Sequence, residues 1–164
     1  MLDLSPTQKG AVAEAEIATA AIRMNLSVLR PIVEGGRYDL AIDVGHKLLR
    51  VQCKWASRNG DVLTIHCKTS RHTPHGYCIT TYSADEIDVI AAYSPDVDRC
   101  YLIPIDEAEH MSMVSLRLAP TRNNQALNVR WARDYEFETS LHRHWLLPKD
   151  DLAVPRPAEL KAIR

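Results

Sequence analysis

The sequence lacks most of the features that mark specialised protein classes. Its four cysteines are dispersed and form no CxxC pair, which argues against a disulfide scaffold and the usual zinc modules. No run approaches the roughly 20 apolar residues of a membrane helix, and the N-terminus lacks the charged-then-apolar layout of a signal peptide. Internal repeats and low-complexity tracts are also missing. We therefore expect a cytoplasmic, globular protein with reduced thiols.

Length and composition favour one folded domain. The chain has 164 residues, of which 46% are hydrophobic and 25% charged, and a chain of this size can bury a core that needs no cross-links. From Pro148 onward the sequence is rich in proline and charge, which is typical of a peripheral or disordered tail. We expect one domain over residues 1–147 and a tail over residues 148–164.

The net charge of −1 hides an uneven distribution along the chain. Residues 46–82 contain six basic residues and one acid, and residues 110–133 contain four arginines and no acid. Residues 84–109 contain eight acids and one base. If the basic segments share one face, that face can bind a polyanion; solvated loops would show the same pattern.

A helix is predicted near the N-terminus. Ser5 suits the N-cap, Pro6 the first helical position, and Gln8 the capping-box position. The Ala-rich segment over residues 7–24 has apolar residues almost all round, which predicts a largely buried helix.

Strands make up most of the rest. Alternating apolar residues and turn signals such as Gly45-His46 and Asn59-Gly60 predict strands over residues 26–32, 38–44, 47–55, 62–69, 87–93, 99–105 and 113–118. Polar segments over residues 70–82 and 120–128 are expected to be loops. The order of the elements predicts an α/β or α+β domain with a mixed sheet.

The hairpin between the second and third predicted strands has two different faces. Because side chains alternate along a strand, Leu40 and Val51 share an apolar face that can stack on the helix. Asp39, Gln52 and Lys54 share the opposite face, and one turn brings the three together. An ordinary solvated hairpin face shows the same alternation of charge, so the spacing alone leaves two interpretations open.

The first interpretation is Mg²⁺-dependent hydrolysis of a phosphodiester. Mg²⁺ prefers hard oxygen ligands, lowers the pKa of bound water and neutralises charge at the scissile phosphate. A lysine can orient the water and stabilise the negative charge of the phosphorane. The predicted helix offers a further carboxylate, Glu14. Glu16 lies about 200° further around the helix and cannot face the same site.

A zinc site in a different part of the chain is an alternative. His72, His75 and Cys78 are spaced by two residues, with His66 and Cys67 nearby, and zinc accepts such ligands in a tetrahedral set. The paired CxxC or helical HxxxH spacing of common zinc sites is missing.

The pattern of Asp39, Gln52 and Lys54 resembles that of the PD-(D/E)xK nuclease superfamily. More narrowly, the chain is similar to the group I intron-associated PD-(D/E)xK endonucleases, which include intron-encoded homing endonucleases. The similar segments are residues 8–18, 37–56, 86–107, 115–125 and 130–137. The resemblance implies the restriction-endonuclease-like α/β fold, a central mixed β-sheet flanked by helices, with the active site at the sheet edge.

The resemblance implies a catalytic role for four residues. Glu14 matches a helix-borne acid, Asp39 the central metal-binding aspartate, and Lys54 the catalytic lysine. Gln52 takes the (D/E) position, so Glu14, Asp39 and Gln52 are the expected ligands of Mg²⁺ or Mn²⁺. Gln52 is the departure that matters for chemistry, because an uncharged ligand binds Mg²⁺ more weakly; the intron-associated branch resembles this chain in using glutamine here.

Partners also follow from the resemblance. It implies double-stranded or branched DNA as substrate and a homodimer or homotetramer, since two strands need two active sites. Arg, Lys, Asn and Gln suit phosphates and base edges, and the candidates for DNA contacts are Arg50, Lys68, Arg71, His72, Arg117, Arg122, Asn123, Asn124 and Gln125. A turn stabilised by Asx-type hydrogen bonds explains residues 122–125 equally well.

Three functions fit this reading of the sequence. The favoured one is a metal-dependent, homing-type DNA endonuclease. The second is a structure-specific nuclease such as a Holliday junction resolvase, which the catalytic residues cannot distinguish from the first because the chemistry is shared. The third is a non-catalytic DNA-binding protein with a relic nuclease site.

Overall fold

The computed structural model of the chain describes residues 3–33, 35–74, 76–120 and 127–146. Within them, the strands are β1 (Ser27–Leu29), β2 (Leu40–Asp43), β3 (Leu48–Asn59), β4 (Val62–His66), β5 (Lys68–Thr73), β6 (Gly76–Thr81), β7 (Val89–Ser94), β8 (Arg99–Pro104) and β9 (Met113–Arg117). The helices are α1 (Pro6–Arg23), α2 (Phe137–His144) and the short 3₁₀ helices η1 (Ile105–Glu107) and η2 (Ala132–Asp134).

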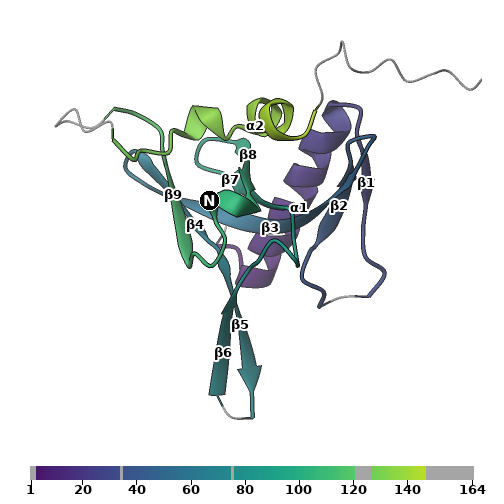
Figure 1. Cartoon of the computed structure of the whole chain (residues 1–164). Helices are drawn as coiled ribbons and strands as arrows, with labels where there is room; N and C mark the ends of the chain where they lie inside the picture. Colours follow the sequence, from purple (N-terminus) through teal and green to yellow (C-terminus); the bar gives the residue numbers. More distant parts are fainter. Residues whose placement is uncertain (1–2, 34, 75, 121–126, 147–164) are drawn as a thin grey trace, which may run out of the picture.

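Seven strands form one mixed sheet, as the sequence predicts. Their order is β1-β2-β3-β4-β9, and β7 pairs with β3 and carries β8 on its other side. The β3–β7 pairing is parallel and the other pairings are antiparallel. Helix α1 packs across this sheet and α2 lies beside β8 (Figure 1). The α/β prediction of a central mixed sheet flanked by helices is confirmed.

Helix α1 begins at the predicted cap. The Ser5 hydroxyl accepts from the backbone N–H of Gln8 at 3.3 Å, and the Gln8 side chain accepts from the Ser5 N–H at 2.9 Å, which completes a capping box. The prediction of a largely buried helix is wrong, because only the stripe of Ala13, Ile17 and Ala21 is fully buried. The sheet covers one side of the helix, and alanines on the other sides tolerate exposure.

Strand β3 separates two hydrophobic clusters. Leu49, Val51 and Cys53 lie in the cluster under α1, whereas Ala56 belongs to the cluster on the opposite face. This is the alternation of side chains expected of a strand. Strands β7 and β8 contribute to both clusters and are therefore buried on both faces.

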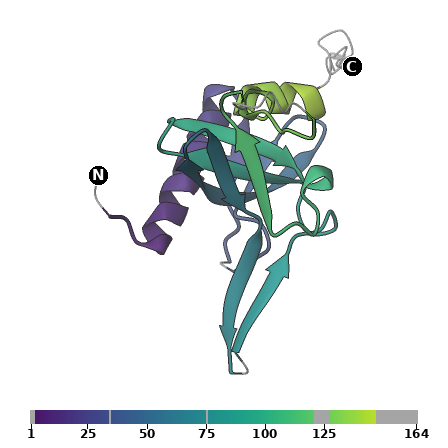
Figure 2. The ribbon, with the colours of Figure 1, turned by 90° about the vertical axis from the view of Figure 1, so that its left-hand side faces the viewer.

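The polar segment over residues 70–82 is not a loop. Strands β5 and β6 pair as an antiparallel hairpin, which projects from the body of the molecule (Figures 1 and 2). Thr69 and Thr80 face each other, with their hydroxyls 2.8 Å apart, and β-branched residues favour strands. The apolar alternation that reveals a strand is missing because the hairpin does not pack on the core.

Two predicted segments lie partly or wholly outside the described residues. These are the tail over residues 148–164 and the middle of the loop over residues 120–128. The division of the chain at residue 147 therefore stays a prediction. In the described part, no helix combines the length and the apolar character needed to cross a membrane.

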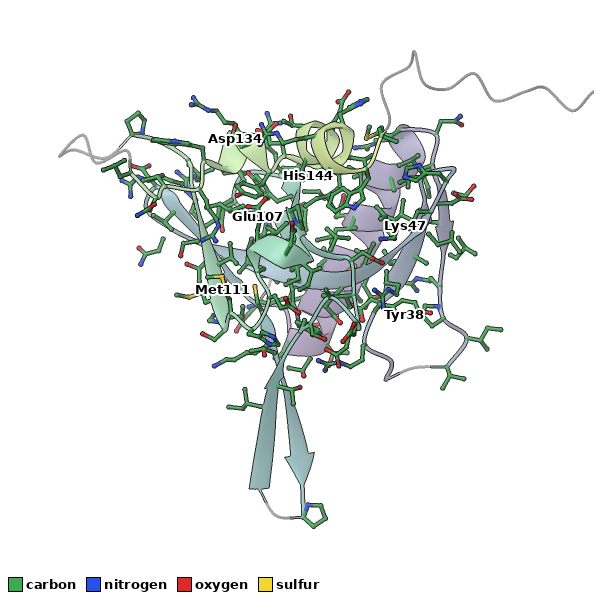
Figure 3. All side chains as sticks on the ribbon, in the orientation of Figure 1. Tyr38, Lys47, Glu107, Met111, Asp134 and His144 are labelled. Atoms are coloured by element: carbon green, nitrogen blue, oxygen red, sulfur yellow. The ribbon has the colours of Figure 1, made fainter. Side chains whose placement is uncertain are left out.

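One acidic residue anchors β3 to the segment that enters β7. The carboxylate of Asp88 accepts from the Arg50 backbone N–H at 2.8 Å and side-chain Nε at 3.0 Å, and from Lys47 Nζ at 2.7 Å. Figure 3 labels Lys47, which directly precedes β3, and Tyr38, which lies two residues before β2. Burial opposes ionisation of Asp88, but the hydrogen bonds and the charges of its partners outweigh it and lower its pKa from 3.8 to about 2.

Because the fold lowers the pKa of Asp88, we expect acid to destabilise the protein by protonating this carboxylate. Its ionised form stabilises the fold by about 2 kcal/mol; the effect is complete above the unfolded pKa near 3.8 and is lost as pH falls through about 2. We expect Asp88→Asn to lose most of this stabilisation at pH 7, measured as the free energy of unfolding in urea. The difference in unfolding free energy between Asp88→Asn and wild type should shrink as the pH falls towards 2. Asp106→Asn, at an exposed position on η1, is the control; an Asp88 variant that unfolds like this control at pH 7 would contradict the assignment.

Candidate active site

Asp39 is held at the start of the β2–β3 pairing. Its backbone N–H donates to the Val51 carbonyl at 2.9 Å, and its carboxylate oxygen Oδ2 accepts from the Cys53 backbone N–H at 2.7 Å. Burial raises the pKa of Asp39, although these hydrogen bonds and the charge of Lys54 counteract part of the effect. In the described part of the chain, no hydrogen bond reaches the other oxygen, Oδ1, which leaves it available to a ligand.

Gln52 lies directly against Asp39. Its amide Nε2 donates to the same Oδ2 atom of Asp39, and its side chain is one of the few buried polar ones described, at 8% exposure. The two-residue alternation of the hairpin therefore brings Asp39 and Gln52 into contact. Its neighbour Cys53 points the other way, into the cluster under α1, where burial raises the pKa of the thiol well above its usual value. Cys53 is core packing and carries no reactive thiolate.

Lys54 lies on the same face of β3 and is half-buried. Its Nζ donates to the Tyr82 hydroxyl at 2.8 Å and to the Lys68 carbonyl at 3.5 Å. Burial lowers the pKa of Lys54, and the negative charge of Asp39 raises it in part. The ammonium therefore interacts with the Asp39 carboxylate without forming a direct salt bridge.

Glu14 and Asp39 line one cavity of about 500 Å³ between α1 and the segment leading to β2. Arg30 lines the same cavity, and its Nη2 donates to Glu14 at 2.6 Å. The charge of Arg30 counteracts a small part of the rise that burial causes in the pKa of Asp39. Glu16, two residues further along α1, lines a different cavity, as the helical spacing predicts.

The donor set fits a hard divalent cation. Glu14 and Asp39 supply carboxylate oxygens, and Arg30 Nη2 already places one positive charge 2.6 Å from Glu14 in this cavity. Among the described residues, no group of three or more His, Cys, Asp or Glu is placed to hold a metal. A third protein ligand here has to be uncharged, and the Gln52 amide oxygen is of the kind that Mg²⁺ accepts.

The zinc alternative finds no support among the described residues, since they contain no cluster of His and Cys that suits a metal. Cys67 is buried in the core. His75 and the side chains of His72 and Cys78 lie outside the described part of the structure.

The candidate DNA contacts are placed unevenly. Arg50 is bound to Asp88 and to the carbonyls of Ala84 and Asp85, so its guanidinium is occupied within the fold. Lys68 is exposed at the base of the projecting hairpin.

Arg117 lies on β9, where its Nε donates to the Ala119 carbonyl at 2.9 Å. The backbones of Arg71 and His72 belong to β5, but their side chains are outside the described set. The segment with Arg122, Asn123, Asn124 and Gln125 also lies outside it.

Three residues around the site were not expected from sequence. Arg30 contacts Glu14; Tyr82 contacts Lys54; and the guanidinium of Arg37 lies 4.7 Å from the centre of the Tyr82 ring. Arg30 lies in the strand predicted over residues 26–32, Arg37 directly precedes the strand predicted over residues 38–44, and Tyr82 ends the segment expected to be a loop. None of these positions carries a periodic signal, because long-range packing alone brings them to the site.

Known proteins similar to this chain are endonucleases. The sequence model of the family described as PD-(D/E)XK endonuclease matches residues 4–138. A solved structure titled as that of a bacterial homing endonuclease, I-Ssp6803I, superimposes with a TM-score of 0.69, covering 84% of this chain and 93% of that chain at 23% sequence identity. At this identity the structural likeness establishes the shared fold. Comparison with the curated proteins gave no match.

The contact between Gln52 and Asp39 yields a test of the proposed ligand set. Gln52→Glu places a second carboxylate against the Asp39 oxygen that now accepts a hydrogen bond. Like charges at this distance repel, so the metal-free variant should be about 1–3 kcal/mol less stable at pH 7. Mg²⁺ should restore more stability to the variant than to wild type, because an added charge strengthens its binding.

Urea unfolding with and without Mg²⁺ measures both effects. Gln8→Glu, on α1 at the capping box, is a control that adds the same charge away from the cavity. Equal Mg²⁺-dependent stabilisation of Gln52→Glu and wild type would remove Gln52 from the ligand set.

Proposed function

Because this chain belongs to the PD-(D/E)XK endonuclease family, we propose that it is a metal-dependent DNA endonuclease that hydrolyses phosphodiester bonds. The observation that carries the proposal is the convergence of Asp39, Gln52 and Lys54 on one face of the β2–β3 hairpin. Glu14, on the neighbouring helix, lines one cavity together with Asp39, and we propose it as the fourth member of the site.

Three residues are the proposed metal ligands. Glu14 and Asp39 offer carboxylate oxygens, and Gln52 offers its amide oxygen once the amide turns away from donating to Asp39. A bound Mg²⁺ or Mn²⁺ supplies charge neutralisation at the scissile phosphate and a more acidic water. Burial of Asp39 raises its pKa, so the carboxylate has more to gain from a cation than an exposed one would.

Lys54 is the proposed catalytic residue that acts on the reacting phosphate. Its ammonium donates to neutral oxygens and forms no salt bridge within the described structure, which leaves its charge uncompensated at short range. A positive charge of this kind stabilises the extra negative charge of a pentavalent phosphorane. Three N–H donors on one nitrogen also allow Lys54 to orient the attacking water while it keeps its protein contact.

Cleavage of DNA by the purified chain with Mg²⁺ or Mn²⁺ tests the proposal. We expect Asp39→Ala and Lys54→Ala to lower the cleavage rate by about 100-fold or more, and Lys54→Ala to bind DNA as wild type does. Asp43→Ala is the matched control: it lies at the end of β2, and in the described structure its side chain accepts a hydrogen bond only from the Gly45 backbone N–H. Cleavage by wild type no faster than by Asp39→Ala would mean that the chain is a non-catalytic DNA-binding protein.

The form of DNA that is cut is the finer part of the proposal. The structural neighbour is titled a homing endonuclease, and we propose that this chain likewise cuts linear duplex DNA at specific sequences, as a homodimer or homotetramer. A duplex library with genomic inserts should yield cuts at a few defined sequences. A four-way junction with matched arms is the comparison substrate; symmetric nicks in the junction, with every linear duplex left intact, would identify a junction resolvase instead.

A further inference from the structure

Lys54 has a long, flexible side chain, and something has to hold its amine in one place for it to act on a phosphate. A lysine stem carries about 2 kcal/mol of rotamer entropy, and an error of about 1 Å in the position of a reacting group can cost about 100-fold in rate. The contacts that fix Lys54 Nζ are therefore part of what determines the rate.

The Tyr82 hydroxyl is the closest of these contacts. Lys54 Nζ lies 2.8 Å from Tyr82 Oη and 4.9 Å from the ring centre. An ammonium above the ring face at that height would lie much further from Oη, so the amine sits beside the hydroxyl as a hydrogen-bond donor. The second contact, with the Lys68 carbonyl, is longer, at 3.5 Å.

Tyr82 is itself rigidly placed. It is 1% exposed and packs in the cluster on the face of β3 opposite α1. Arg37 covers the ring, with its guanidinium 4.7 Å from the ring centre, and is fixed by Glu86 and by the Thr81 carbonyl, both at 2.7 Å from Nη2. Because Tyr82 is buried and held by its neighbours, its hydroxyl can restrict the position of the flexible Lys54 amine.

We propose that Tyr82 is the positioning residue for Lys54, acting through the hydrogen bond from Lys54 Nζ to Tyr82 Oη. Tyr82 does not touch the substrate in this proposal; it fixes the amine that does. The inference rests on the proposed nuclease function for its effect on rate, but the contact itself can be measured without any cleavage.

The chain offers a second buried tyrosine as a matched control. Tyr93 is 9% exposed, and its hydroxyl donates to Asp98 Oδ1 at 3.0 Å in the cluster under α1. Tyr82→Phe and Tyr93→Phe remove the same atom from opposite faces of the sheet. Only the first removes a partner of Lys54, so a difference between the two variants reports on the amine and not on core packing.

Cleavage kinetics give the first readout. With Mg²⁺, Tyr82→Phe should lower kcat by between about 10- and 100-fold, while KM and the affinity for DNA in metal-free buffer stay within about 2-fold of wild type. Tyr93→Phe should keep kcat within the same 2-fold range. A Tyr82→Phe protein with wild-type kcat, or one whose kcat falls no more than that of Tyr93→Phe, overturns the proposal.

The ammonium signal of Lys54 gives the second readout. A buried, hydrogen-bonded ammonium exchanges its protons slowly, so we expect a resolved ¹H–¹⁵Nζ signal in wild type, assigned by its loss in Lys54→Ala. The signal should persist in Tyr93→Phe and disappear in Tyr82→Phe. Its absence from wild type, which needs no folded variant to establish, or its persistence in Tyr82→Phe, overturns the proposed contact.

The two readouts separate the two proposals. If wild type cuts no DNA but shows the Tyr82-dependent signal, the nuclease function fails and the contact stands as a structural one. If wild type cuts DNA and the signal does not depend on Tyr82, the nuclease function stands and the positioning role fails.

Discussion

Strand β2 pairs with β3 so that Leu40 lies opposite Val51, and the N–H of Asp39 donates to the Val51 carbonyl at 2.9 Å. Because side chains alternate, this one register turns Leu40 and Val51 towards α1 and Asp39 towards Gln52. A slip by one residue would exchange the two faces, exposing the apolar set and burying the charges under the helix. The one register therefore sets both the packing of the helix on the sheet and the convergence of the candidate site residues.

The parts of the fold that are predictable from sequence are those set by neighbouring residues. The α1 cap and the turns at Gly45 and Gly60, where φ is 90° and 58°, are set by a few adjacent residues. The strands that pack on the core are predictable from their apolar residues, which alternate along β2 and β4 and are continuous along β7. Hairpin β5–β6 does not, because it projects from the core and its strand preference comes from β-branched residues such as Thr69 and Thr80 alone. The extent to which α1 is buried could not be predicted either, because alanine occurs equally well on buried and on exposed faces of a helix.

The residues of the candidate site likewise divide into those that a local pattern predicts and those that only tertiary packing brings together. Asp39, Gln52 and Lys54 lie within one hairpin, where two-residue alternation and one turn are enough to predict their convergence. Tyr82 and Arg37 belong to segments that meet only through tertiary packing, and Arg37 ties the segment before Asp39 to Thr69 and Thr80 at the base of the hairpin. Arg50 gives a second example of a long-range contact: an aspartate 38 residues later in the chain binds its guanidinium. Pairing across such separations has no local signature.

The uncharged Gln52 is best understood together with Arg30. Without a metal, two carboxylates facing one cavity need compensation, and here Gln52 donates to Asp39 while Arg30 donates to Glu14. A carboxylate at position 52 would bind a divalent cation more strongly but would leave three negative groups with one arginine between them. In the proposed site, a glutamine at position 52 would bind the cation more weakly than a carboxylate would, but it keeps a hydrogen bond to Asp39 in the metal-free protein. A divalent cation held by all three proposed ligands would require Arg30 to leave Glu14 and the Gln52 amide to turn away from Asp39.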